Sequence, residues 1–188
     1  MTAAATQVAP QHDWLSQGDV FEKMLHPRAV VSQSTTQAQL DQVPAMVVTH
    51  SCALDKKTGS GKSKLEWVTF VPIQKVSELD PQRAQMLRDR AWDLHPYEVM
   101  YLGDLDKIGE SYCSLTFPYT LPAPLLNTQL KTFTPEETGD DDEESNRRIV
   151  LGAWDYRLGT LTPEALDLFH LKWSIHWTRI KPELEVTE

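Results

Sequence analysis

Short hydrophobic runs separated by polar stretches dominate the chain, a pattern typical of strands and short helices. The run at 45–54 enters from Pro44, and the adjacent Val47 and Val48 predict a strand buried on both faces. Runs at 18–21 and 67–73 predict one strand before it and one after it, with Gly18-Asp19 as a turn. This order favours three strands of a small β-barrel.

Two segments carry helix-start signals. Asp80 followed by Pro81 predicts a helix to about residue 93, and Thr162-Pro163-Glu164 predicts a final helix to about residue 179. The final helix has a wide apolar face, which packs on a sheet or across a homodimer interface. Further strands are expected at 98–102, 111–116 and 148–154. We expect Trp154, Trp173 and Trp177 in the core, and His170 and His176 on the surface or at an interface.

The predicted organisation is one α+β domain of barrel and packed helices at 13–180, between a flexible tail at 1–12 and a second tail at 181–188. Residues 32–43, rich in Gln, Ser and Thr, indicate a polar loop. Residues 134–146 hold a run of acidic side chains that cannot bury enough apolar surface to become ordered, so we expect a disordered insertion.

Charge and cysteine content narrow the class of protein. The formal net charge is -9, which disfavours a general nucleic-acid binder, although the balance is close to neutral without the acidic insertion. Two cysteines are too few for a secreted disulfide framework, so we expect both reduced on strands. The N-terminal residues lack a signal-peptide pattern and no run is long enough for a membrane span, so we expect a cytoplasmic protein without membrane contact.

Candidate chemistry lies at the end of the run at 45–54. On a strand, His50 and Cys52 share one face and Thr49 and Ser51 share the other. A Cys beside a His is the pattern of an activated thiolate nucleophile, so both are candidate catalytic residues. The alternatives are zinc ligation, for which no further ligand spacing occurs, and plain packing. We expect Cys52 to be buried, His50 to lie near the rim, and no metal or cofactor to be bound.

Candidate binding residues are Thr49, Ser51, Lys62 and Arg148. Lys62 lies in a basic loop at 55–64 that resembles a phosphate-binding loop. Lys56 occupies the position of a required glycine, and a strand-like run follows in place of a helix. The sequence therefore predicts no nucleotide binding there.

The order of Gly18-Asp19, the run from Pro44 and the run at 68–73 resembles the MazF/PemK-like toxins, and Leu161-Thr162-Pro163-Glu164 resembles the start of their closing helix. The resemblance implies an SH3-like barrel. It also implies RNA cleavage by an arginine before the proline of the second block and a threonine after the third. Val43 and Gln74 stand at those positions, so the family's ribonuclease chemistry is expected to be absent or rebuilt.

The function expected on these grounds is a toxin-like or defence-associated binding module of bacteria or phage. It would contact a protein, RNA or DNA partner. The alternatives from another class are an endoribonuclease with a rebuilt site and a hydrolase based on Cys52. The sequence leaves open whether the protein is an enzyme and whether it forms a homodimer.

Overall fold

The computed structural model describes residues 4–8, 15–31, 36–54, 65–123 and 157–178. Several expectations lie outside these residues. They are the binding candidates Lys62 and Arg148, the acidic insertion at 134–146, the strand at 148–154 and the placement of Trp154.

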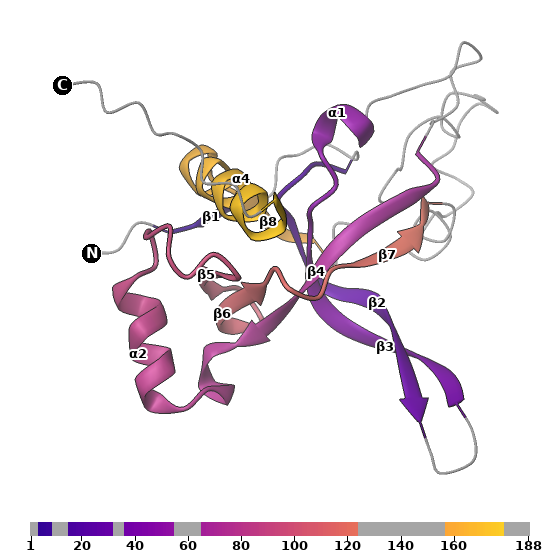
Figure 1. Ribbon diagram of the computed structural model, residues 1–188, viewed down its shortest axis with the longest axis horizontal. Coiled ribbons are helices and arrows are strands. Elements are labelled where there is room, and N and C mark those ends of the chain that lie inside the picture. Colours follow the sequence, from indigo (N-terminus) through magenta and orange to yellow (C-terminus); the bar gives the residue numbers. More distant parts are fainter. Residues whose placement is uncertain (1–3, 9–14, 32–35, 55–64, 124–156, 179–188) are drawn as a thin grey trace.

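The described residues form an α+β fold in which an antiparallel sheet is joined by a long C-terminal helix (Figure 1). In chain order the elements are β1 (Thr6–Val8), β2 (Asp19–Val31), β3 (Thr36–Val47), α1 (Ser51–Leu54), β4 (Trp67–Lys75), the 3-10 turn η1 (Val76–Glu78), α2 (Pro81–Asp89), β5 (Val99–Leu105), β6 (Gly109–Ser114), β7 (Tyr119–Pro122), β8 (Arg157–Leu161) and α4 (Pro163–Thr178). Within this part of the chain, every helix is too short or too polar to cross a bilayer.

Hydrogen bonds order the described strands as β1-β8-β2-β3-β4-β6-β5, and β7 pairs with β4. The three strands expected at the start of the fold, β2, β3 and β4, are therefore neighbours. The described strands form an open sheet and not a hydrogen-bonded closed barrel. The two strands that end this order, β1 and β5, nevertheless contact each other.

The prediction of a polar loop at 32–43 is wrong over most of its length. Residues from Thr36 onward belong to β3, which pairs with β2 as far as Val31 opposite Thr36. Cross-strand pairing outweighed the polar composition, because a strand needs only partners for its backbone and not a continuous apolar run. The resulting ribbon of β2 and β3 extends away from the other elements (Figure 1).

Part of the tail expected at 1–12 is also structured. Thr6–Val8 forms β1, which pairs with β8, and Ala5 is buried in the main core. The expected strands missed both β1 and β8, which are 3 and 5 residues long. Strands this short carry too few residues for periodicity to reveal them.

Helix α4 covers one face of the sheet. Ala165 and Phe169 are fully buried in a cluster with residues of β3, β4, β5 and β6. Truncating a buried Phe such as Phe169 to Ala costs about 3–5 kcal/mol. Trp173 packs partly buried against this cluster, whereas Trp177 is half exposed, so its expected place in the core is wrong.

Helix α2 is capped as predicted and is fixed to the β5–β6 hairpin. Asp80 Oδ1 accepts a hydrogen bond from Arg83 N at 3.0 Å.

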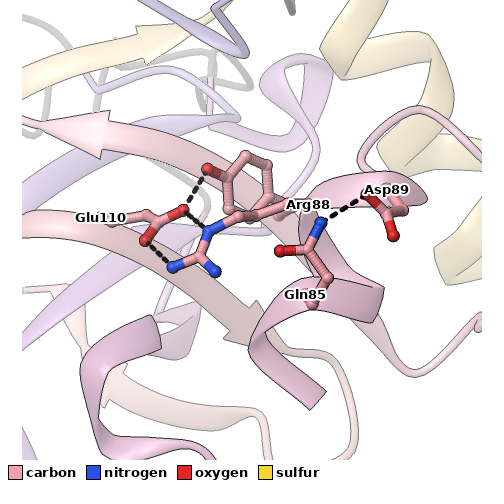
Figure 2. Close-up of polar contacts among 5 residues, drawn as sticks. Gln85, Arg88, Asp89 and Glu110 are labelled. Carbon is pink, nitrogen blue, oxygen red and sulfur yellow. Dashed lines mark hydrogen bonds and ion pairs between the residues drawn. The ribbon is translucent and has the colours of Figure 1, made fainter. Parts of the chain in front are cut away.

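An ion pair fixes α2 to the hairpin. The guanidinium of Arg88 donates from Nε and Nη2 to the two carboxylate oxygens of Glu110, each at 2.6 Å, and Tyr101 donates to the same carboxylate at 2.7 Å (Figure 2). The helix ends at Asp89, earlier than expected. The Arg88 contact lowers the pKa of Glu110.

A buried ion pair joins β2 to β8. Arg157 Nη1 donates to Asp19 Oδ2 at 3.0 Å, and both side chains are almost completely buried. Asp19 Oδ2 also accepts a hydrogen bond from Ser16 N at 2.8 Å. Burial raises the pKa of Asp19, against the opposing effects of the Ser16 N–H and the Arg157 charge. The pair therefore depends on both members, since either charge alone would be buried without compensation.

We expect Arg157→Met to lower the free energy of unfolding by about 3–5 kcal/mol, because it leaves the Asp19 charge buried and unpaired. Asp19→Asn together with Arg157→Met is expected to cost clearly less than the sum of the two single changes. Urea denaturation of the wild type, the two single variants and the double variant measures this coupling. Arg28→Ala, which breaks the exposed Arg28–Asp41 pair, serves as a control with an expected cost below about 1 kcal/mol. Strictly additive costs would contradict the prediction.

Candidate functional site

The end of β3 differs from the strand expected at 45–54. The strand stops at Val47, and Ser51–Leu54 forms the single helical turn α1. Val48 N still donates to Thr69 O, at 3.0 Å, but the Thr49 side chain then accepts from Thr69 N at 2.7 Å. The Thr49 hydroxyl thus replaces a backbone partner and ends the pairing. His50 and Cys52 therefore do not share the face of a strand.

Gln17 holds the chain segments of this site together. Its side-chain Nε2 donates to Val48 O at 2.9 Å, and its backbone N–H donates to Ser51 Oγ at 3.2 Å. Its Oε1 pairs with His170 Nε2 at 2.9 Å. Gln17 is buried, so these contacts join the turn before β2, the end of β3 and helix α4. Gln17 was not among the candidate residues, because nothing in its local sequence pattern indicates a partner 153 residues away.

Two histidines face each other at this site. The rings of His50 and His170 are stacked, with centroids 6.0 Å apart and planes 20° from parallel. Because Gln17 Nε2 is committed to a carbonyl, its Oε1 is the acceptor, so His170 carries a proton on Nε2. His50 Nδ1 accepts from Cys52 N at 3.2 Å, which leaves its Nε2 for the proton when the ring is neutral. His170 was expected on the surface or at an interface, but it is half-buried in this site.

The environment of His170 disfavours its charged form. Burial lowers its pKa below 6.5, the nearby His50 adds to this effect, and the Asp167 carboxylate opposes it. We call Gln17, Thr49, His50, Ser51, Cys52 and His170 the histidine site. Its parts come from the turn before β2, the segment that runs from the end of β3 into α1, and α4, so no local sequence pattern brings them together.

The two cysteines differ in accessibility. Cys52 is exposed and Cys113 is buried, so the expected burial of Cys52 is wrong. Cys52 lies on α1 and not on a strand, whereas Cys113 lies on β6 as expected. Burial raises the pKa of Cys113 to about 12. The contact between His50 and Cys52 joins a ring nitrogen to the backbone N–H and not to the thiol.

The described part of the chain contains no group of three or more His, Cys, Asp or Glu side chains arranged to hold a metal ion. Val43 and Gln74, the positions that would carry toxin-like cleavage, lie on neighbouring strands. The pairing of β3 with β4 ends at Ala45 opposite Pro72. Beyond that point Val43 pairs with Met24 of β2 and Gln74 pairs with Tyr112 of β6, and the described sheet shows no pairing between Val43 and Gln74. An aliphatic side chain and an amide provide neither a cation nor a group that readily moves a proton.

No protein-family model matches the chain. No curated protein sequence matches it significantly.

We expect one thiol per chain to react with a thiol reagent at neutral pH in the native protein, because Cys52 is exposed and Cys113 is enclosed. The second should react only after unfolding in denaturant. Cys52→Ser should abolish labelling of the native protein, while Cys113→Ala should leave its rate unchanged. Native labelling that survives Cys52→Ser would show that the placement of Cys113 is wrong.

We expect His170 to titrate below pH 6.5 and His50→Ala to raise its pKa, because this change removes a second imidazole and admits water. With a lowered pKa, the native protein binds fewer protons than the unfolded chain just below pH 6.5. The free energy of unfolding should therefore fall as the pH drops through that range. NMR titration of the ring resonances measures the pKa. His176→Ala, in the last turn of the same helix, is the matched control and should leave the pKa of His170 unchanged.

Proposed function

We propose that this protein is a toxin-like or defence-associated binding module of bacteria or phage, which contacts a protein partner through the histidine site and lacks the ribonuclease chemistry of MazF/PemK-like toxins. The proposal rests on the side chains at the two positions that, by the resemblance, would cleave RNA. They are Val43 on β3 and Gln74 on β4, and neither an aliphatic side chain nor an amide supplies a cation or a group that readily moves a proton.

The order of the strands supports the toxin-like part of the proposal. Gly18 has φ +86° and leads into β2, which is followed by β3 and β4 as antiparallel neighbours, and α4 begins at the Pro163 of the resembling segment. We also propose that the sheet is an SH3-like barrel. The contact between β1 and β5, the two ends of the strand order, supports this fold, because a barrel forms when a sheet curls until its edges meet.

The composition of the histidine site favours a protein partner over nucleic acid. None of its six residues is Lys or Arg, and Asp167 lies close enough to influence His170. Nucleic-acid binding depends mainly on cationic side chains that neutralise phosphates. The site instead presents the exposed His50 and Cys52 above a buried amide, which suits hydrogen bonding to polar groups of a protein surface.

A second candidate is an endoribonuclease with a rebuilt site, and the stacked histidines favour it. RNA cleavage through the 2′-hydroxyl needs a general base and a general acid. In their neutral forms His170 carries an acceptor at Nδ1 and His50 a donor at Nε2, which are the two functions that such cleavage needs. A hydrolase based on Cys52 has less support, because His50 bonds to the backbone of Cys52 rather than to its thiol.

We expect purified protein to leave a mixed-sequence single-stranded RNA intact over the pH range 5 to 8, to the same extent as the double variant His50→Ala/His170→Ala. Gel electrophoresis of the end-labelled RNA measures cleavage. Cleavage that is lost in the double variant, with a bell-shaped dependence on pH, would replace the binding module by the rebuilt ribonuclease.

The partner is tested by placing a photoreactive amino acid at position 50 in bacterial cells and identifying the crosslinked products by mass spectrometry. A matched protein carries the same group at position 107, which is exposed on the β5–β6 turn. We expect a protein adduct specific to position 50. Adducts that are equal at both positions, or adducts with nucleic acid alone, would contradict the proposal.

A further inference from the structure

A groove separate from the histidine site lies between α2 and the loop that follows it. Its volume is about 620 Å³, within the range of sites that bind ligands. Leu79, Met86, Leu87, Val99 and Phe117 supply its apolar lining.

One side of α2 and the residue that follows it form the first wall. Arg83, Met86 and Leu87 of α2 line the groove together with Arg90, which comes directly after the helix, and their spacing of three and four residues places the helical ones on one side of the helix. This wall is held in place by a buried cluster and by an ion pair to β6. Ala84 and Leu87 pack with Val76 and Tyr112 in a buried cluster, and Figure 2 shows the double hydrogen bond from Arg88 to the β6 carboxylate.

The opposite wall is fixed by a buried lysine. Lys172 of α4 is 2% exposed, and its Nζ donates to Leu94 O at 3.0 Å and to Pro96 O at 2.8 Å. These carbonyls flank His95, so the ammonium group holds the loop that brings His95 and Pro96 to the groove. Burial lowers the pKa of Lys172 to about 8. With both walls fixed within the fold, the groove is preformed.

Two large apolar side chains that line the groove are exposed to solvent. Phe117 is 71% exposed and Met86 is 40% exposed. Large exposed apolar side chains that gather at a hollow mark interaction sites, because a partner gains stability by covering them. Their exposure also makes the hollow an open surface groove, which suits a segment of polypeptide better than an enclosed small molecule.

The charged side chains that line the groove favour a partner of a particular charge. Arg83 and Arg90 line it, and Glu98 supplies one opposing carboxylate. Arg83 has an exposed ion pair with Asp80, in which Nε lies 3.3 Å from Oδ2. No salt bridge joins Arg90 to any residue in the described part of the chain. Guanidinium groups bind carboxylates in a forked geometry, so an acidic partner complements these two arginines.

We propose that this groove binds an acidic, apolar peptide segment of a partner protein. An aromatic or branched side chain of the peptide packs against Phe117 and Met86, and neighbouring carboxylates pair with Arg83 and Arg90. The surface is distinct from the histidine site, and binding there does not depend on what the histidine site contacts.

Fluorescence anisotropy with the full-length protein tests this assignment. The probe is a panel of labelled eight-residue peptides with a central phenylalanine or leucine flanked by glutamates, compared with peptides in which lysines replace the glutamates or alanine replaces the central residue. We expect saturable binding of the acidic, apolar peptides alone. Phe117→Ala and Arg90→Glu should each weaken it by about tenfold or more.

Two variants match these changes elsewhere on the surface. Trp67→Ala removes another exposed aromatic side chain, and Arg28→Glu reverses another exposed arginine; neither should change peptide affinity. Thermal unfolding confirms that each variant is folded. The proposal is overturned if no peptide of the panel binds, if the lysine peptides bind as well, or if the control variants weaken binding equally. It is also overturned if sedimentation shows a dimer lost in Phe117→Ala, or if single-stranded RNA binds in a manner lost in Arg90→Glu.

Discussion

The buried ion pair between Asp19 and Arg157 is the constraint on which the rest of the arrangement depends. It joins the first residue of β2 to the first residue of β8, across 138 positions of sequence. The same carboxylate orders the preceding turn through Ser16 N. Around this pair, Gly18 N donates to Val47 O, and Leu161 N donates to Gly18 O. The ion pair and these two backbone hydrogen bonds together fix β2, the end of β3 and the entry to α4 relative to one another, at the cost of desolvating two charges.

The histidine site is a direct consequence of that junction. Gln17 lies between Ser16 and Gly18, so a turn ordered by Asp19 also sets the position of the amide that binds Val48 and His170. The Thr49 hydroxyl ends the backbone pairing of β3 with β4. The polar residues that follow therefore leave the sheet, and His50 and Cys52 are exposed. Stability and recognition therefore share one turn, and changes that weaken the ion pair will disturb the site without touching it.

Helix α4 connects this site to the groove beside α2. His170 and Lys172 are two positions apart, and two positions on an α-helix rotate by about 200°. One side chain therefore meets Gln17 while the other reaches the carbonyls of Leu94 and Pro96. The buried face between them carries Ala165 and Phe169 into the core. A single helix thereby positions both proposed interaction surfaces, and the packing of its apolar face keeps them in a constant relation.

The sequence alone determined those features that depend on neighbouring residues. The Asp80 cap, the starts of α2 and α4, the strands β4, β5 and β6 and the burial of Val47 and Val48 all follow from local rules of capping and periodicity. Only the tertiary structure decided the rest. The β2–β3 ribbon and β1 exist because distant partners satisfy their backbones, and Cys52 is exposed because Thr49 ends the strand before it. Gln17, His170 and Lys172 gain their roles from contacts across 31 to 153 positions, and no local propensity encodes a contact at such separations.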